Sequence, residues 1–205
     1  MEIIGRVRVW IYDRAVAPMT ATWYRKVLER LPPGCELLDV GIGTGSALMI
    51  NTNLLIEKDI FVRGIDVDRA YIAHCRREVA RRRLRGSIDA RCESLYDHYG
   101  GPYDAIYFSG SFMLLPDPQA ALRHARLLLM PGGQLYFTLT FEHQSSRFIE
   151  RLKPWLRFLT TIDFGRVTYE YEFRKTLCGG GVALEELKVL HKGRRRSAIL
   201  AIGRV

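Results

Sequence analysis

Short apolar runs alternate with amphipathic stretches along the first two thirds of the chain. The runs have the length and composition of buried strands, whereas the stretches between them repeat apolar residues at the spacing of helix turns. The predicted strands cover residues 36–41, 60–66, 87–94, 103–109 and 134–141. The predicted helices cover residues 20–31, 46–56, 69–84 and 116–130. Strands that alternate with helices favour a parallel sheet covered on both faces, the doubly wound α/β arrangement.

The pattern changes after the fifth predicted strand. Residues 142–166 are rich in aromatic side chains and interrupted by proline, which indicates an irregular insertion that would cover a substrate. Residues 167–177 alternate in polarity and predict a strand, residues 184–190 fit a short helix or a strand, and residues 197–205 predict a final strand. We expect the last strands to form an antiparallel pair at one edge of a mostly parallel, seven-stranded sheet, so that residues 1–205 form a single domain.

The composition is that of an ordinary globular protein, with 48% apolar and 26% charged residues among 205. No apolar run approaches the roughly 18 to 20 residues that span a bilayer, so we expect no transmembrane segment. The N-terminus lacks the uninterrupted apolar core of a signal peptide, which indicates a cytoplasmic protein. The four cysteines form no CxxC pair, so neither a zinc site nor a disulfide framework is indicated.

The formal net charge is +9, and much of the excess lies in two basic runs. These are Arg76, Arg77, Arg81, Arg82, Arg83 and Arg85, and then Lys192, Arg194, Arg195 and Arg196. Such clusters suit a nucleic acid or an acidic membrane surface, or they form solvated faces of a helix and a loop. Aromatic residues do not alternate with the arginines as a base-stacking surface requires, which favours the solvated faces.

The stretch LLDVGIGTGSAL ends the first strand with Asp39 and continues into a turn that contains Gly41, Gly43 and Gly45. A dinucleotide site uses GxGxxG, but here the third glycine comes one residue early. Asp39 would also repel a pyrophosphate. S-adenosylmethionine carries sulfonium and ammonium cations instead, so a carboxylate beside the turn is favourable. Bare glycine backbone would let such a ligand lie close to the chain.

The segment DVGIGTG resembles the glycine motif of class I S-adenosylmethionine-dependent methyltransferases. The resemblance continues in Asp66, 25 residues after Gly41, and in CESL at the end of the third strand. YDAI at the start of the fourth strand and MPGG before the fifth are similar to the family as well. Residues 10–141 carry this resemblance. In compactness and in the insertion after the fifth strand, the chain resembles the ubiquinone- and menaquinone-biosynthesis group.

The resemblance implies S-adenosylmethionine as the cofactor and suggests the residues that hold it. Asp66 would accept hydrogen bonds from both ribose hydroxyls, and Glu93 would reach the adenine amino group, where the family has an aspartate. Tyr12 stands where related small-molecule methyltransferases place an aromatic ring over the cofactor. The expected cofactor-binding residues are Tyr12, Asp39, Gly41, Ile42, Gly43, Thr44, Gly45, Asp66, Val67, Cys92, Glu93, Ser94 and Ser109.

Methyl transfer is an in-line displacement, so an enzyme needs mainly to align the reactants and exclude water. A base is needed only where the acceptor must lose a proton. No residue pattern marks such a base; His143, just after the fifth strand, and Tyr12 are the candidates for a catalytic role. The carboxylates of a catechol-type metal site are missing after the fourth strand, so we expect no metal.

We therefore predict an enzyme that transfers a methyl group from S-adenosylmethionine to a small molecule. Two alternatives stay open at this point. The basic runs suit an RNA methyltransferase, and a chain of this kind can also bind the cofactor without turnover and assist a partner enzyme. The sequence specifies neither the acceptor nor the oligomeric state.

Overall fold

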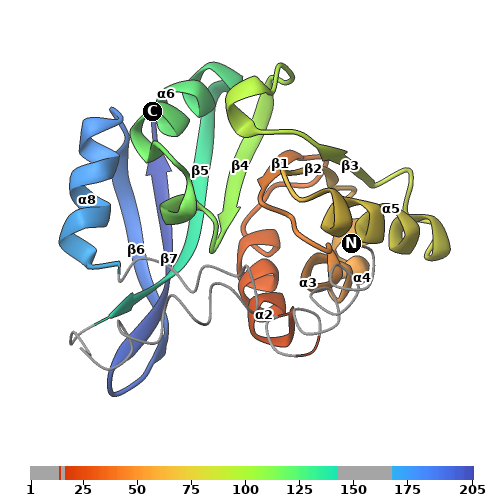
Figure 1. Cartoon of the computed structure of the whole chain (residues 1–205), viewed down its shortest axis with the longest axis horizontal. Coiled ribbons are helices and arrows are strands. Elements are labelled where there is room, and N and C mark those ends of the chain that lie inside the picture. Colours follow the sequence, from red (N-terminus) through yellow and green to blue (C-terminus); the bar gives the residue numbers. More distant parts are fainter. Residues whose placement is uncertain (1–13, 15–16, 143–167) are drawn as a thin grey trace.

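The computed structural model describes residues 14, 17–142 and 168–205, which form a sheet covered by helices (Figure 1). The strands are β1 (Glu36–Val40), β2 (Phe61–Asp66), β3 (Ile88–Cys92), β4 (Tyr103–Ser109), β5 (Leu129–Glu142), β6 (Ala183–Lys192) and β7 (Arg196–Arg204). The helices are α2 (Ala17–Leu28), α3 (Ser46–Met49), α4 (Thr52–Glu57), α5 (Arg69–Arg81), α6 (Pro118–Leu128) and α8 (Glu170–Gly179). Two single turns of 3-10 helix are η1 (Leu95–Asp97) and η2 (Phe112–Leu114).

The seven strands of the described residues form one sheet in the order β3-β2-β1-β4-β5-β7-β6. Strands β1 to β5 pair in parallel, and β7 runs antiparallel to both β5 and β6. This confirms the predicted doubly wound sheet with an antiparallel C-terminal pair. The chain returns from β3 across β2 and β1 to β4, so the order of the strands reverses beside β1.

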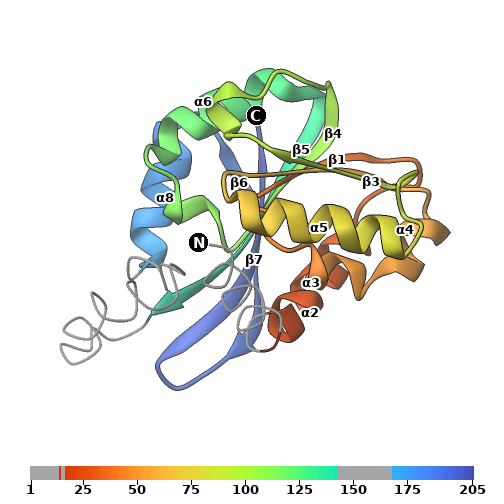
Figure 2. The same ribbon diagram turned by 45° about the vertical axis from the view of Figure 1, so that its right-hand side comes forward.

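Apolar side chains on both faces of the strands explain why the sheet is covered on both sides. In β1, Leu37 packs into one hydrophobic core and Leu38 into the other, and both are fully buried. Helices α2 to α5 supply the first core, whereas α6, α8 and the two 3-10 turns supply the second. The two groups of helices lie on opposite sides of the sheet (Figure 2). A central strand buried on both faces is the usual state of a parallel sheet.

The strand predicted over residues 167–177 is wrong, because this stretch contains helix α8. Its alternating aromatic residues suit a strand, but Phe173 and Leu177 are four residues apart and both are buried, as on one face of a helix. Arg174 and Glu170 form an ion pair at the same helical spacing. The strand that pairs with β7 is instead β6, which includes the segment that fitted either a helix or a strand.

The predicted helices also end differently. Helices α2 and α5 end at Leu28 and Arg81, before the predicted ends at residues 31 and 84. The stretch 46–56 is divided into α3 and α4 at Asn51, whose side-chain amide donates hydrogen bonds to the carbonyls of Ala21 and Ala47. Helix α6 ends at Leu128, and β5 begins at the next residue. The predicted covering insertion lies outside the described residues except for Glu142. No helix in the described ranges is long and apolar enough to cross a membrane.

Helix α8 yields a stability test with an internal control. Phe173 is 0% exposed, whereas Tyr171 is 73% exposed. Phe173→Ala should lower the free energy of unfolding by about 3 to 5 kcal/mol, because it empties a site between three other phenylalanines. Tyr171→Ala should change this free energy by less than about 0.5 kcal/mol. Denaturant unfolding measures both effects. Equal losses would contradict the helix, because in a strand both side chains face the same side.

Candidate functional site

The turns that follow β1 and β4 meet where the strand order reverses. The hydroxyl of Ser111, just after β4, donates a hydrogen bond to the carbonyl of Val40, the last residue of β1. Ser109 ends β4 and pairs with Thr138 of the neighbouring β5. In open α/β sheets, ligands bind outside the carboxyl ends of the strands at such a reversal. The residues around these turns are therefore the candidate site.

The glycine turn is shaped by the packing of the chain itself. Gly41 and Gly45 have φ angles of 85° and 71°, a region that favours glycine. A Cβ atom at Gly41 would lie 2.6 Å from the Cβ of Ser111, and one at Gly45 would lie 2.6 Å from the sulfur of Cys75. At these two positions, side chains of the protein fill the space that we had expected to admit a ligand. Gly43 also has a positive φ, of 60°.

The other two residues of the turn are buried. Ile42 packs against Gly64 of β2, where a Cβ would lie 2.3 Å from its side chain. The hydroxyl of Thr44 lies 3.1 Å from the hydroxyl of Ser46 and accepts a hydrogen bond from the Ser46 amide. Both side chains therefore hold the turn in place, and the turn leads directly into α3.

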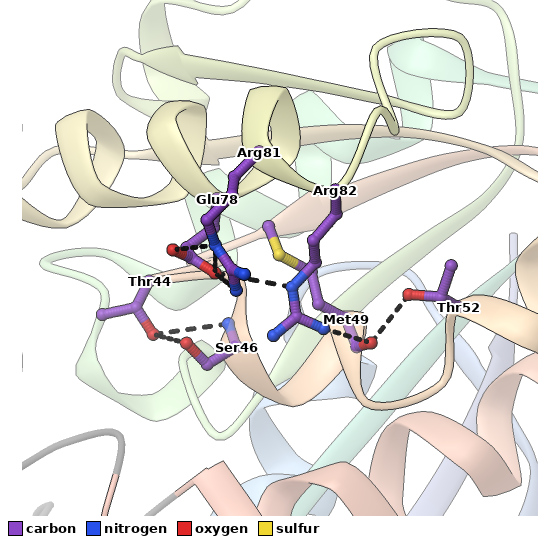
Figure 3. Close-up of polar contacts among 7 residues, drawn as sticks. All are labelled: Thr44, Ser46, Met49, Thr52, Glu78, Arg81 and Arg82. Atoms are coloured by element: carbon purple, nitrogen blue, oxygen red, sulfur yellow. Dashed lines mark hydrogen bonds and ion pairs between the residues drawn. The ribbon is translucent and has the colours of Figure 1, made fainter.

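Helix α5 supports the far end of α3 (Figure 3). The guanidinium of Arg82, just after α5, donates a hydrogen bond of 3.3 Å to the carbonyl of Met49, and the hydroxyl of Thr52 donates one of 2.7 Å to the same oxygen. Glu78 lies 3.4 Å from the Arg82 guanidinium and holds it in position. Carbonyls at a helix end lack partners within the helix, so these donors stabilise α3.

Asp39 lies in the central strand and is 0% exposed. One carboxylate oxygen, Oδ2, accepts a hydrogen bond of 2.7 Å from the hydroxyl of Tyr24 in α2. The other, Oδ1, is buried and has no hydrogen-bond partner among the described residues. Burial raises the pKa of the Asp39 carboxyl to about 7, although the Tyr24 hydrogen bond opposes this shift. A buried carboxylate oxygen without a donor is costly, so this oxygen suits a cationic or hydrogen-bonding ligand.

Asp66 ends β2 and holds the glycine turn from the neighbouring strand. Its Oδ2 accepts a hydrogen bond of 3.0 Å from the amide of Gly43, and its Oδ1 accepts one of 2.8 Å from the amide of Asp68. Burial raises the pKa of the Asp66 carboxyl, and these amide hydrogen bonds oppose the rise. Val67, the next residue, is 71% exposed, so an apolar side chain faces outward beside this carboxylate.

The end of β3 brings a third carboxylate to the same edge. The amide of Glu93 donates a hydrogen bond of 3.1 Å to the carbonyl of Asp66. One carboxylate oxygen of Glu93 lies 2.7 Å from Nδ1 of His98, a buried residue that the sequence analysis missed. Cys92 is exposed, and its thiol donates a long contact of 3.8 Å to a backbone carbonyl. Ser94 accepts a hydrogen bond from a backbone amide of η1 and so begins that turn.

The remaining predicted residues and features lie elsewhere. Tyr12 and His143 fall outside the described residues, so their predicted roles stay predictions. In the described ranges, no group of three or more potential metal ligands comes together. A groove of about 530 Å³ lies at the amino-terminal halves of β2 and β3, away from the three carboxylates. Its lining residues are Phe61, Arg76, Val79, Arg85, Ile88, Asp89 and Ala90.

The sequence resembles known methyltransferases. Residues 38–135 match the family described as "Methyltransferase domain". Nocamycin O-methyltransferase of Saccharothrix syringae is 33% identical over an alignment of 140 residues that covers 62% of this chain and 49% of that protein. Ubiquinone biosynthesis O-methyltransferase of Acinetobacter baumannii is 26% identical over an alignment of 187 residues that covers 86% of this chain and 75% of that protein. The chain thus spans about half the length of the nocamycin enzyme.

Solved structures share the fold at low sequence identity. The cyclase SpnF superposes with a TM-score of 0.73 at 18% identity, over 90% of this chain and 80% of that one. A SAM dependent methyltransferase from Aquifex aeolicus superposes with a TM-score of 0.66 at 20% identity, over 87% and 88%. The sheet, the glycine turn and these similarities agree: the chain is similar to S-adenosylmethionine-dependent methyltransferases of class I, in its fold and over part of its sequence. S-adenosylmethionine is the cofactor of this class.

The glycine turn yields a test of its internal packing. Gly45→Ala should destabilise the protein more than Gly34→Ala, although both glycines have φ angles above 70°. At Gly34 a Cβ meets nothing within 4 Å, so only backbone strain of about 1 to 2 kcal/mol is expected. At Gly45 the contact with the Cys75 sulfur should add about 1 to 3 kcal/mol. Denaturant unfolding measures the difference, and equal losses would exclude the contact as the cause.

Asp39 should make the stability of the ligand-free protein depend on pH. Its folded pKa of about 7 exceeds the ordinary aspartate value of 3.8, so the native state binds the proton more tightly, and stability falls as pH rises between these values. Asp39→Asn removes this effect and should stabilise the ligand-free protein relative to wild type. The advantage should be larger at pH 8 than at pH 5, by about 2 kcal/mol. Urea unfolding at both pH values tests this, and a pH-independent difference would contradict it.

Proposed function

We propose that the protein transfers the methyl group of S-adenosylmethionine to a hydroxyl group of a small organic acceptor. The observation that carries this proposal is the edge formed by Asp39, Asp66 and Glu93, at the carboxyl ends of three adjacent strands. Three carboxylates beside a glycine turn suit a cationic ligand rich in hydroxyl and amino donors. They do not suit a pyrophosphate, which they would repel.

The unpaired oxygen of Asp39 supports the fit to this cofactor. Oδ1 is buried and lacks a donor within the described residues. The α-ammonium of S-adenosylmethionine provides both a positive charge and hydrogen-bond donors, and these offset the cost of a buried carboxylate. Binding of the ammonium would also favour the ionised form of Asp39 over the protonated form.

Asp66 would hold the ribose. Each carboxylate oxygen has two lone pairs, and each already accepts one hydrogen bond from a backbone amide, of Gly43 or of Asp68. The Val67 amide also donates to this carboxylate, so at least one of its four lone pairs is left for a ribose hydroxyl. These amide bonds fix the orientation of the carboxylate before the ligand arrives, which lowers the entropy lost on binding. Val67, Cys92 and Ser94 lie along the same edge and would flank the adenine.

When bound, S-adenosylmethionine supplies a methyl group activated by a positively charged sulfur. The chain would mainly align the cofactor with the acceptor, because the residues proposed to bind the cofactor lie at the ends of rigid strands. An acceptor hydroxyl must also lose a proton, and His143 stays a candidate for that step. Tyr12 stays a predicted contact to the cofactor and a second catalytic candidate.

A hydroxyl acceptor is proposed because the relatives that cover most of the chain are named O-methyltransferases. The RNA alternative has less support. Arg76 donates to the carbonyl of Ala90, and Arg81 and Arg82 form ion pairs with Glu78, so part of the basic surface is used within the protein. A cytoplasmic location stays a prediction from the sequence.

Mutation of Asp66 tests the cofactor site. Asp66→Ala should weaken the binding of S-adenosylhomocysteine by about 1 to 3 kcal/mol, the usual value of hydrogen bonds to a charged acceptor. Asp89→Ala is the matched control, because Asp89 is a carboxylate on adjacent β3 whose ion pairs with Arg63 and Arg91 lie away from the turn. The affinity of the Asp89→Ala variant for S-adenosylhomocysteine should equal that of wild type. Calorimetry measures both, and an unchanged affinity in folded Asp66→Ala protein would refute the ribose assignment.

Methylation of a pool of hydroxylated small molecules tests the reaction itself. Isotope-labelled S-adenosylmethionine should transfer its label to at least one compound, and mass spectrometry of the product should place the methyl group on oxygen. Labelling of RNA alone, with affinity that falls steeply as salt rises, would favour the nucleic-acid alternative. Tight binding of the cofactor with no transfer to any pool would favour a scaffold.

A further inference from the structure

A buried histidine connects the candidate adenine site to the core of the sheet. His98 is 1% exposed, and both of its ring nitrogens have partners. Nδ1 lies 2.7 Å from Oε1 of Glu93, and Nε2 lies 2.8 Å from the hydroxyl of Tyr103, the first residue of β4. The three side chains form a continuous line from the exposed edge of the sheet into its interior.

The partners determine the direction of the hydrogen bonds in this line. An ionised carboxylate can only accept, so Nδ1 of His98 carries the proton and donates it to Glu93. In a neutral imidazole, Nε2 then accepts, and the hydroxyl of Tyr103 donates to it. Burial raises the pKa of Tyr103, which keeps its phenol protonated and able to donate. Every polar atom of the histidine ring is thus satisfied.

The surroundings of His98 restrict the position of its ring. Its carbonyl accepts a hydrogen bond of 2.8 Å from the ring of His124 in α6, and its ring stacks on that of Tyr103 with 5.9 Å between centroids. A Cβ at Gly100 would lie 2.8 Å from both His98 Nε2 and the Tyr103 hydroxyl. The imidazole is therefore a rigid donor aimed at the end of β3.

A hydrogen bond from His98 orders the side chain of Glu93, which is longer and more flexible than that of an aspartate. A glutamate has three rotatable side-chain bonds, and free rotation would cost entropy each time the carboxylate was ordered against a ligand. The bond to His98 orders it in advance. The Glu93 side chain is 29% exposed, and its second oxygen, Oε2, accepts no hydrogen bond from any described residue. One oxygen is anchored and the other remains available at the edge.

We infer that His98 is a positioning residue, which holds Glu93 so that Oε2 selects an amino-substituted purine at the end of β3. This inference rests on the proposed function, because it concerns the nucleoside part of the same cofactor. His98 itself contacts no ligand and acts only through Glu93. Tyr103 supports it by keeping the proton of the imidazole on the side of Glu93.

The test compares two probes that differ in the purine base, S-adenosylhomocysteine and S-inosylhomocysteine. Inosine has a carbonyl where adenine has the amine, and it also carries a proton on N1. Its position 6 therefore cannot donate to Glu93, and the carbonyl oxygen repels the carboxylate. Wild-type protein should bind the adenosyl probe at least about tenfold more tightly, as expected for one hydrogen bond to a charged group. In Glu93→Ala the two affinities should become nearly equal.

Two substitutions at position 98 separate the donor to Glu93 from the rest of the ring. His98→Asn puts an amide near the place of Nδ1 and should keep most of the selectivity. His98→Gln puts its amide near the place of Nε2, keeps the link to Tyr103 and loses the donor to Glu93; its selectivity should fall at least about fivefold. Circular dichroism checks that each variant is folded, and calorimetry measures each affinity.

The outcomes distinguish this inference from the proposed function. The role of His98 would be overturned if folded His98→Gln kept the wild-type preference for the adenosyl probe. It would also be overturned if His98→Gln and His98→Asn lost this preference to the same extent. Equal binding of the two probes by wild type would overturn the role of Glu93 while cofactor binding stands. Failure of wild type to bind either probe would instead refute the proposed function. If neither position-98 variant folds, the affinities of wild type and Glu93→Ala for the two probes still decide whether Glu93 distinguishes the amino group.

Discussion

A fully buried carboxylate in the central strand is the constraint around which this structure is arranged. Asp39 lies between β2 and β4, where only apolar residues are normally stable, and Tyr24 satisfies one of its oxygens. The unpaired oxygen destabilises the ligand-free protein and favours a cationic ligand. Natural proteins retain such local costs mainly at functional sites, because binding there offsets them.

Residues around Asp39 stabilise the fold and also orient the groups of the candidate site. Asp66 holds the amide of Gly43 and at the same time offers lone pairs at the edge of the sheet. Gly41 and Gly45 allow Ser111 and Cys75 to pack against the turn. The turn is consequently rigid before any ligand binds, and rigid strand ends place groups more precisely than flexible loops do.

The fold by itself leaves the reaction open. One of the structures that share it is named a cyclase, and others are named methyltransferases. The assignment of methyl transfer therefore depends on the carboxylates at the strand ends and on relatives in sequence, rather than on the sheet. His98 is a further example at smaller scale, because its contact with Glu93 belongs to the side chains of this chain and not to the sheet.

The sequence by itself determined the parallel strands, the helices between them and the glycine turn, because each depends on local periodicity or on a backbone conformation that favours glycine. It also indicated Asp39, because this acid lies beside the glycine turn, whereas Asp66 and Glu93 were indicated by the resemblance to the methyltransferase family. Only the tertiary structure decided that residues 170–179 form a helix. Their alternating pattern fits either element, and packing of Phe173 against distant aromatic residues selects one. The contacts of Glu93 with His98 and of Gly45 with Cys75 are likewise set by packing, because no local pattern in the chain indicates which side chains will meet.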